Sequence, residues 1–214
     1  SCAEEKPAPQ EEQAPGVAGP LTAPCEKAVF EDIPLTLCIA DPKTDRIHTA
    51  LAPEQGPPYR GLAAYAAARG DDVDRIRFAM NGGMFDDDGE PIGYYVEDGE
   101  RFSNLNRRRG PGNFHMLPNG VFFGTGSEWE VRTSEDFYDN VTTRPDFGTQ
   151  SGPMLVIDGE LHPDIDPEGT SLRVRNAVGI DSAGRALFVI SDAPLSFGQL
   201  ARFYRDVLKV KNAL

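Results

Sequence analysis

Hydrophobic positions along this chain alternate with polar ones in short segments, and turn residues separate these segments. A period of two residues is typical of strands that bury one face, so the pattern predicts many short β-strands. Asp98-Gly99, Asn119-Gly120 and Asp158-Gly159 have the composition of tight hairpin turns, and the polar segment 181–185 predicts a fourth hairpin connection. The predicted strands are 35–39, 46–51, 76–80, 92–96, 114–117, 121–123, 129–132, 154–157, 160–161, 175–181 and 186–190.

A helical period occurs in fewer places. Residues 62–69 are rich in alanine and precede Gly70, a residue type that commonly ends helices, and residues 134–138 fit a short helical turn. Ser196 followed three positions later by Gln199 has the spacing of a capping box, which predicts the start of the last helix. The apolar face of this helix consists of Phe197, Leu200, Ala201, Tyr204, Val207 and Leu208. These elements predict the α+β class, with a mixed, largely antiparallel β-sheet, hairpins and a few packed helices.

Composition and charge narrow the classes of partner. The chain has 214 residues, with 34 Asp and Glu against 21 Lys and Arg, so its formal net charge is −13. Binding to nucleic acid requires cations that neutralise phosphates, and anionic lipid surfaces attract polybasic segments, so the charge argues against both partners. No stretch approaches the ~20 apolar residues of a membrane span.

The N-terminal residues differ in composition from the rest. Residues 1–24 are mostly Pro, Ala, Gln, Glu and Gly and bury little apolar surface, which predicts a disordered Pro-rich tether before a single domain at 25–214. A small residue precedes Cys2, as at the processing site of a lipoprotein; the alternative is an ordinary secreted start with an incidental cysteine. Lipidation of Cys2 would give the only membrane contact and a periplasmic or outer-envelope location, whereas the alternative gives a secreted protein.

The two remaining cysteines, Cys25 and Cys38, flank the start of the predicted domain. In an oxidising compartment, a disulfide between them would connect the entrance of the fold to its first strand. The alternative is two free buried thiols. The tether favours the disulfide, because it points to a location outside the cytoplasm.

Two segments after the strand 76–80 carry candidate chemistry. In Asn81-Gly82-Gly83, adjacent glycines allow backbone N–H groups to approach a ligand, and an asparagine both donates to and accepts from a sugar hydroxyl or phosphate oxygen. The alternative is a tight turn that ends the strand. The acidic segment 86–90 offers carboxylates to a divalent cation such as calcium, without the spacing of a calcium loop. Its alternative is a solvated acidic turn.

Arginines form two further candidates. Segment 107–109 is a run of three arginines in an acidic chain; guanidinium groups bind phosphate through paired hydrogen bonds, and the alternative is a solvated loop. Arg173 and Arg175 lie two apart on a predicted strand and therefore on one face. Two such charges repel unless an anion or a carboxylate lies between them. Asp192, at the end of the next strand, is the natural carboxylate, so the choice is between a phosphate site and a structural Arg–Asp pair.

Ser151 follows polar residues at the edge of a hydrophobic strand, but the chain has no Gly-x-Ser-x-Gly sequence around it. The histidines His48, His115 and His162 have no spacing typical of a catalytic triad, and no two of them lie four residues apart as in zinc peptidases. The sequence therefore disfavours a serine hydrolase and a zinc peptidase.

Several short motifs occur in a fixed order, and this succession resembles the phosphodiester glycosidase domain family over residues 25–214. The family includes a lysosomal enzyme that removes N-acetylglucosamine from phosphodiester-linked mannose, and the chain is most similar to short members from the envelope of Gram-negative bacteria. The motifs are Asn81-Gly82-Gly83-Met84-Phe85, Pro91-Ile92-Gly93, Gly112-Asn113-Phe114, Asn119-Gly120-Val121-Phe122-Phe123, Gln150-Ser151-Gly152-Pro153, Arg175-Asn176-Ala177-Val178-Gly179, Ser196-Phe197-Gly198 and Lys211-Asn212-Ala213-Leu214.

The resemblance implies a surface cavity and a reaction, the cleavage of the bond between a sugar anomeric carbon and a phosphodiester oxygen. It implies that Arg175 holds the phosphate and that a carboxylate, Asp192 or Asp86, stabilises the oxocarbenium-like centre or activates water. The residues implied in substrate binding are Asn81, Gly82, Gly83, Gln150, Ser151, Gly152, Arg173 and Asn176. The cavity motifs also include Gly179.

One departure from the family pattern concerns the end of the chain. Family members continue past Asn-Ala-Leu into a short strand that ends in Leu-Asp-Gly, whereas this chain stops at Leu214. The domain is therefore expected to lack its last strand and an acidic residue on it. Two hypotheses follow: a hydrolase of sugar-1-phosphodiesters in the cell envelope, or a non-catalytic protein that binds envelope glycans or glycolipids.

Overall fold

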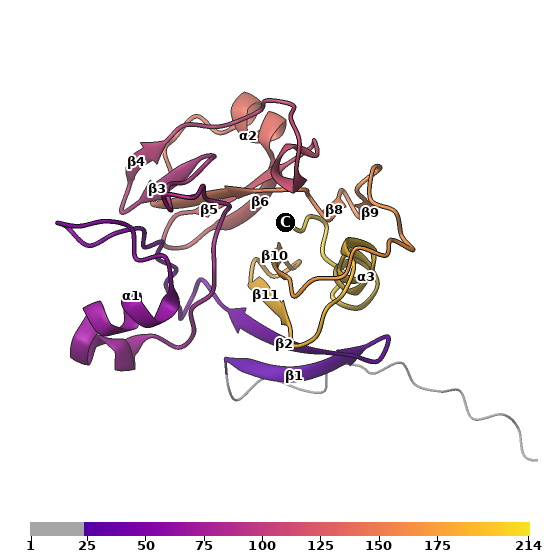
Figure 1. The fold of residues 1–214 in the computed structure, drawn as a ribbon, viewed down its shortest axis with the longest axis horizontal. Coiled ribbons are helices and arrows are strands. Elements are labelled where there is room, and N and C mark those ends of the chain that lie inside the picture. The colour runs from indigo at the N-terminus through magenta and orange to yellow at the C-terminus, as the bar shows by residue number, and fades with distance from the viewer. Residues whose placement is uncertain (1–23) are drawn as a thin grey trace, which may run out of the picture.

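The computed structural model describes residues 24–214, which form two antiparallel β-sheets, each with one helix packed on its outer side (Figure 1). The four-stranded sheet has the order β1 (Cys25–Phe30), β2 (Ile33–Ala40), β11 (Ala186–Ser191) and β10 (Asn176–Ile180). The five-stranded sheet has the order β4 (Glu100–Ser103), β3 (Tyr95–Glu97), β7 (Phe147–Ser151), β5 (Gly120–Gly124) and β6 (Trp129–Thr133). A small hairpin joins β8 (Val156–Ile157) to β9 (Glu160–Leu161). The α+β class predicted from the sequence is confirmed.

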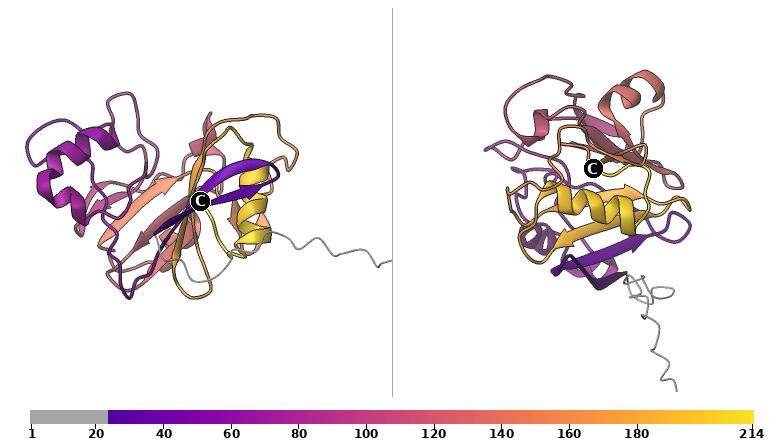
Figure 2. Two further views of the ribbon diagram at one scale, coloured as in Figure 1. Left: turned by 90° about the horizontal axis from the view of Figure 1, so that it is seen from below. Right: turned by 90° about the vertical axis from the view of Figure 1, so that its right-hand side faces the viewer.

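Three α-helices accompany the sheets in the described part of the chain: α1 (Leu62–Arg69), α2 (Ser134–Asn140) and α3 (Phe197–Arg202). Figure 2 shows α3 lying over the four-stranded sheet, while α1 stands apart from both sheets. The capping box at Ser196 and Gln199 is present, and α3 continues into a π-helical turn at Phe203–Val207. The C-terminal glycine of α1, Gly70, has a positive φ of 55° and leads into a 3-10 turn.

Alternation along the strands gives the four-stranded sheet two buried faces. Leu35, Leu37 and Val189 point toward α3, and Tyr204 lies fully buried in the same core. Cys38, Val178 and Phe188 point the other way, toward aromatic and aliphatic residues of the five-stranded sheet. The rings of Phe122 and Phe188 are 5.7 Å apart in this second core. Neighbouring residues on β10 therefore belong to opposite faces, which decides where each motif residue can act.

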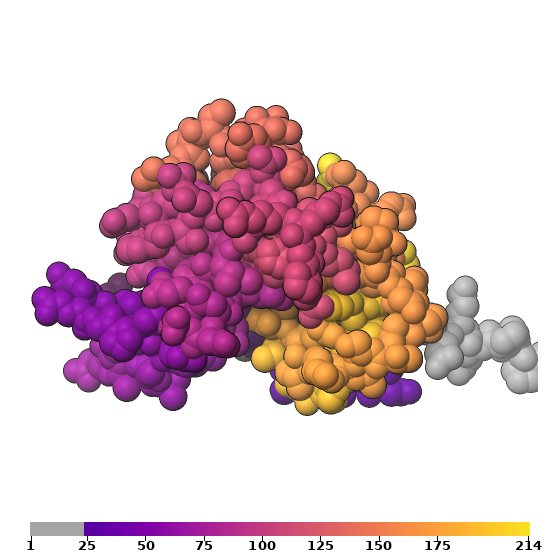
Figure 3. Space-filling model, turned by 45° about the horizontal axis from the view of Figure 1, so that its top comes forward, coloured from indigo at the N-terminus to yellow at the C-terminus, as the bar shows by residue number. Residues whose placement is uncertain are grey.

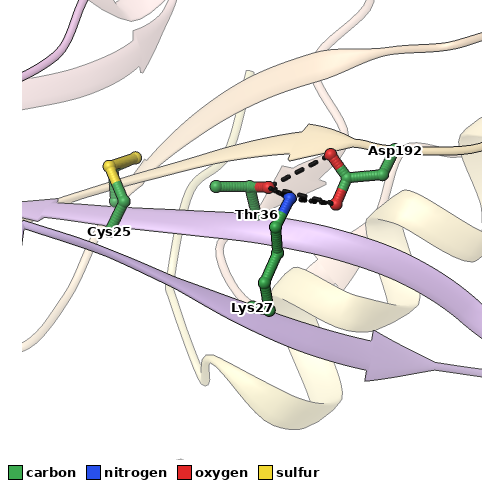
Figure 4. Close-up of a disulfide and its surroundings, with 5 residues drawn as sticks. Cys25, Lys27, Thr36 and Asp192 are labelled. Atoms are coloured by element: carbon green, nitrogen blue, oxygen red, sulfur yellow. Dashed lines mark hydrogen bonds and ion pairs between the residues drawn. A yellow bond between two sulfur atoms is a disulfide. The ribbon is translucent and has the colours of Figure 1, made fainter.

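The disulfide between Cys25 and Cys38 is present, which confirms that prediction. The two cysteines are direct partners in the antiparallel pairing of β1 with β2, near one end of the hairpin (Figure 4). The lipidation site at Cys2 and the tether at 1–24 fall outside the described residues apart from Pro24. Within residues 24–214, no helix is long and apolar enough to cross a membrane.

Several predicted elements differ from the structure. Residues 46–51 and 76–80 form no strand, because their contacts are isolated: Thr49 Oγ1, for example, donates to the carbonyl of Val96. Residues 114–117 were expected as a strand, but 113–115 form a 3-10 turn. Asn119-Gly120 is no hairpin turn, since Asn119 is fully buried and Gly120 begins β5. The hairpins at Asp98-Gly99, Asp158-Gly159 and 181–185 are confirmed.

The last residues, Ala213 and Leu214, are bound to strands. Leu214 exchanges two backbone hydrogen bonds of 2.8 Å with Val178 of β10, and Ala213 bridges to both Val156 and Gly179. The side chain of Asn212 donates to the carbonyl of Val131 in β6, 3.1 Å away. This segment therefore connects the two sheets. The expectation of a further strand in the family beyond Leu214 stays a prediction.

Candidate active site

The loop Asn81–Gly83 is fixed between the two sheets. The N–H of Gly83 donates to Thr149 Oγ1 of β7 at 2.7 Å, and the side-chain amide of Asn176 in β10 donates to the carbonyl of Asn81 at 2.8 Å. A Cβ atom at residue 83 would overlap the carbonyl oxygen of Gln150, so close contact with β7 requires glycine there. The first and sixth sequence motifs are thus brought together although 95 positions separate Asn81 from Asn176.

Some polar groups of this loop are left open. Asn81 and Gly82 are exposed, and within residues 24–214 neither the side-chain amide of Asn81 nor the N–H of Gly82 has a hydrogen-bond partner. Ser151 lies on the same face of β7 as Thr149, because the two are separated by one residue. The loop thus offers donors and acceptors to a ligand beside a rigid strand. Figure 3 shows, on one face of the molecule, the magenta segments around residue 100 bordering the orange and yellow segments that follow residue 150.

Asp192 lies on the same face of the four-stranded sheet as Asn176. The pairing register places Asn176, Ile190, Thr36 and Lys27 in one row across the strands. The carboxylate of Asp192 accepts from Lys27 Nζ at 2.9 Å and from Thr36 Oγ1 at 3.1 Å (Figure 4). The hydrogen bond from Lys27 holds the pKa of Asp192 below its usual value. Asp192 is therefore a carboxylate that stays ionised at neutral pH.

Arg175 projects from the opposite face of β10, toward α3. Its Nε donates to the carbonyl of Leu195 at 3.1 Å, its Nη2 donates to that of Ser171 at 3.0 Å, and its guanidinium lies 3.6 Å from the ring centre of Phe197. The structural pair between Arg175 and Asp192 that the sequence offered as an alternative is wrong, since Asp192 binds Lys27 instead.

Arg173 and Arg175 nevertheless form a positively charged group. Burial lowers the pKa of Arg175, and the nearby charge of Arg173 lowers it further. Within residues 24–214, neither guanidinium forms an ion pair with a carboxylate. Two adjacent cations without a counter-charge are a favourable place for an anion. The prediction of a phosphate contact here stays a prediction, although the site faces away from Asn176.

Gln150 is buried and has no hydrogen-bonding capacity left for a ligand. Its Oε1 accepts from the N–H groups of Tyr94 and Asn106 at 2.8 and 3.0 Å. Its Nε2 donates to the carbonyl of Asn106 and to Ser134 Oγ at 2.7 and 2.9 Å. The expected contact between Gln150 and a sugar hydroxyl is therefore replaced by an internal role, the positioning of the segment around Asn106. Gly152 is likewise buried, and a Cβ there would press on the carbonyl of Phe114.

Asp86 stabilises its own turn. Its Oδ1 accepts from the N–H groups of Asp88 and Glu90 at 2.9 and 3.0 Å, so residues 86–90 form a self-capped acidic turn. In the described part of the chain, no group of three or more His, Cys, Asp or Glu residues is placed to hold a metal ion. The structure thus gives no ligand set for the calcium ion considered from the sequence. Asp86 also makes no hydrogen bond to the four-stranded sheet, whereas Asp192 is held there by Lys27 and Thr36.

The sequence interpretation missed a buried polar network. Asn119 Nδ2 donates to the carbonyl of Phe114 at 3.0 Å, and Ser134 Oγ donates to Asn119 Oδ1 at 2.6 Å. Ser134 also accepts from Gln150, so the network joins three motif segments. The signal in the sequence was an asparagine beside a hydrophobic strand, but the same Asn-Gly pair is typical of a hairpin turn. Lys27 and Thr36, which hold Asp192, carried no signal.

Comparisons with known proteins agree with the fold of this chain. The family model described as phosphodiester glycosidase matches residues 74–214. A protein of Escherichia coli K12 named uncharacterized protein YigE is 32% identical over 177 residues, which cover 81% of this chain and 67% of that protein. The catalytic domain of zebrafish N-acetylglucosamine-1-phosphodiester α-N-acetylglucosaminidase, solved in a form auto-inhibited by its pro-peptide, has a similar fold. The TM-score is 0.60 at 17% identity, over 89% of this chain and 67% of that one. By its sequence match, the chain belongs to the phosphodiester glycosidase family of hydrolases.

Proposed function

We propose that this protein hydrolyses the bond between the anomeric carbon of a sugar and the oxygen of a phosphodiester in the cell envelope. Family membership supports this reaction class. The observation that carries the proposal is the open polar loop at Asn81 and Gly82, held on the same side as an ionised Asp192. Water attacks the anomeric carbon, the carbon–oxygen bond breaks, and its electron pair stays on the phosphate. The products are a free sugar and a phosphomonoester.

Each group has a distinct task in this scheme. The amide of Asn81 and the N–H of Gly82 bind sugar hydroxyls. Asp192 is a poor general acid because its pKa is lowered, so it stabilises the positive charge at the anomeric carbon or takes a proton from the attacking water. A phosphodiester is a good leaving group, which reduces the need for an acid. Arg173 and Arg175 hold the phosphate as negative charge develops.

The two sides of this site meet at the end of β11. The backbone N–H of Arg175 donates to Ser191 Oγ at 2.9 Å, and Asp192 directly follows Ser191 in the chain. The side chains of Arg175 and Asp192 therefore flank the end of the same strand from opposite faces. A substrate that lies across this end, with its sugar toward Asp192 and its phosphate toward Arg175, would contact both.

We further propose that the reaction takes place in the periplasm or at the outer envelope, with Cys2 as the lipid-bearing residue. The disulfide between Cys25 and Cys38 supports an oxidising compartment. Labelling cells with an alkynyl fatty acid should mark the wild-type protein and not a Cys2→Ser variant. Equal labelling of both would contradict the anchor.

The catalytic proposal is tested by sugar release. The purified protein, extended through any residues that follow Leu214 in its gene, should release sugar from at least one member of a panel of sugar-1-phosphodiesters. Asp192→Asn and Asn81→Ala should lower the rate at least tenfold, whereas the matched control Asp158→Asn should not. Asp158 is an exposed carboxylate that pairs with Lys211 far from the loop. No release by a folded wild-type protein would overturn the proposal.

A second function, the binding of envelope glycans without turnover, is favoured by one observation. Glycosidases commonly use a pair of carboxylates. On the face of the four-stranded sheet that carries Asn176, the paired residues of the strands include no carboxylate, and Asp192, just after β11, supplies a single one. This alternative predicts micromolar binding to glycans on an array, with no product formed after prolonged incubation. Product formation by the wild type, lost in Asp192→Asn, would exclude it.

A further inference from the structure

A hollow lies at the edge of the five-stranded sheet, where β4 ends. It has a volume of about 330 Å³ and is lined by Ile92 and by the segment 102–108, which follows from β4. Binding sites for small molecules commonly enclose roughly 300–1,000 Å³, so this hollow has room for one small unit. The arginine run that the sequence singled out forms part of its wall.

The charges of this arginine run are only partly balanced. Arg107 donates to Glu135 Oε2 at 2.6 Å and stacks on the ring of Tyr138, 3.8 Å away. Arg108 and Arg109, by contrast, are exposed and form no ion pair within residues 24–214. In a chain whose net charge is −13, two guanidinium groups without a carboxylate beside a hollow create a local site for an anion.

The same hollow offers an aromatic surface. Phe102 is 56% exposed, and its ring centre lies 6.3 Å from that of Tyr95, which supports it from one side. Asn104 is exposed, and its side chain has no partner among the described residues. The flat apolar face of a pyranose packs on such a ring, and an amide binds the hydroxyls at its edge. Phenylalanine, asparagine and arginine together suit a sugar that carries an anionic group.

The wall of the hollow is pre-organised by the buried network. Both backbone groups of Asn106 are held by Gln150, and the side chain of Asn106 donates to the carbonyl of Ile92 and accepts from the N–H of Arg108. A fixed wall reduces the ordering cost of binding. Gln150 also connects the hollow to the candidate site, because its own carbonyl abuts Gly83. Ile92 adds a second connection by donating its N–H to the carbonyl of Met84.

We propose that this hollow is a subsite for a neighbouring unit of a phosphate-linked glycan, with a sugar on Phe102, its hydroxyls on Asn104 and a phosphate on Arg108. The inference rests on the proposed function and adds the substrate class, a polymer of sugar phosphodiesters rather than a single diester. Because β7 separates the hollow from the loop Asn81–Gly83, a substrate must extend beyond one sugar unit to occupy both places.

The test compares ligands of different length and charge by calorimetry. The probes are four-unit hexose-1-phosphate oligomers built on glucose, mannose or N-acetylglucosamine, with phosphonate linkages that resist hydrolysis. The single-unit phosphonates and neutral tetrasaccharides of the same sugars serve as comparison ligands. The wild type should bind one four-unit oligomer at least tenfold more tightly than its single unit and its neutral counterpart. Raising the salt concentration should weaken the binding of the charged oligomer alone.

Variants of residues that line the hollow test whether the preference for the four-unit oligomer arises there. Arg108→Ala and Phe102→Leu should each weaken oligomer binding about tenfold, while Phe102→Trp, which keeps a ring, should retain it. Arg101→Ala is the matched control, since Arg101 is an exposed arginine of β4 outside the hollow. Hydrolysis of a single-unit diester should be unchanged in all four variants. Equal binding of oligomer and single unit by the wild type, or wild-type oligomer binding by Arg108→Ala and Phe102→Leu, would overturn the subsite.

The two proposals fail in different ways. Selective oligomer binding that depends on Phe102 and Arg108, without hydrolysis of any diester, supports the subsite and overturns the proposed reaction. Hydrolysis of single-unit diesters without selective oligomer binding overturns the subsite and leaves the reaction standing.

Discussion

Replacing Gln150 by leucine removes an amide whose donors and acceptor are all used inside the protein. Leucine fills similar space but leaves the N–H of Tyr94, both backbone groups of Asn106 and the hydroxyl of Ser134 without this partner. A buried polar group left unpaired costs about 1–3 kcal/mol. The N–H of Tyr94 is enclosed, whereas water reaches Asn106 more easily. We therefore expect the free energy of unfolding to fall by about 3–5 kcal/mol.

For a domain of this size the loss corresponds to a decrease of roughly 6–20 °C in melting temperature. Thermal melts and urea titrations measure the change, and hydrogen exchange should accelerate at the amides of Tyr94 and Asn106. Asn140→Ala is the control, because Asn140 is an exposed amide on α2 whose one side-chain hydrogen bond within residues 24–214 is to Asp136. A Gln150→Leu variant as stable as the control, but unable to bind substrate, would refute the internal role and make Gln150 a direct ligand contact.

Three further predictions concern the disulfide, Arg175 and His162. The pair Cys25→Ala and Cys38→Ala should reduce the free energy of unfolding by ~3 kcal/mol in the chain-entropy account for cysteines 13 positions apart, and equal urea midpoints for this variant and the oxidised wild type would contradict it. Arg175→Ala should lower both the melting temperature and, by roughly a hundredfold to a thousandfold, the rate of sugar release, with partial rescue by lysine. Asp192→Ala should leave the melting temperature nearly unchanged, because its partner Lys27 is exposed. An Arg175→Ala variant that is destabilised but fully active would exclude a phosphate contact at Arg175. Burial lowers the pKa of His162, so its contribution to stability is complete above the unfolded pKa of about 6.5 and decreases as the pH falls below it, by at most about 1.4 kcal/mol per pH unit. Stability measured between pH 7 and pH 5 should fall less steeply in His162→Gln than in the wild type, and parallel curves would contradict the assignment.

Local signals in the sequence predicted those elements that depend on local geometry. The turns at Asp98-Gly99 and Asp158-Gly159 require positive φ at both positions, which this residue pair accepts, and both hairpins formed. The capping box at Ser196 likewise depends on residues within one helical turn. Asn119-Gly120 carries a similar local signal, but tertiary contacts determine its conformation. The buried side chain of Asn119 binds groups from two other segments, and no hairpin turn forms there.

The strands that were missed obtain their stability from distant partners. β7 contains glycine and glutamine in an irregular pattern, yet it pairs with β3 and β5, and its residues Thr149 and Gln150 each bind a separate loop. β1 alternates weakly and is fixed at the sheet edge by its pairing with β2 and by the disulfide. No window of sequence that contains only the strand itself includes these interactions.

In the candidate site, a single sequence predicts the relative directions of neighbouring side chains in a motif, but not the partners that they meet. Arg175 directly precedes β10, whose first residue is Asn176. Alternation along this extended segment alone places their side chains on opposite faces, and they cannot line one face of a cavity together. Which face meets the loop at Asn81 could not be predicted, because this depends on α3 covering the other one. The sequence therefore predicts that Arg175 and Asn176 point to opposite faces, but it does not predict which of these faces carries the site.

Unused hydrogen-bonding capacity separates the motif residues that hold the fold from those that are open to substrate. Gly83 and Gly152 are glycines because backbone passes within contact distance, and Gln150 has no donor or acceptor left. The side-chain amide of Asn81 and the N–H of Gly82 retain theirs, and so does the guanidinium of Arg108, which lies outside the motifs. A buried polar group that is fully paired acts on substrate only through the segments it positions. An unpaired exposed group on a fixed backbone can exchange bound water for a ligand with little loss of conformational entropy. Substitution of a fully paired residue should therefore alter stability and activity together. Substitution of an unpaired exposed residue should weaken substrate binding, and any activity that depends on it, without altering stability.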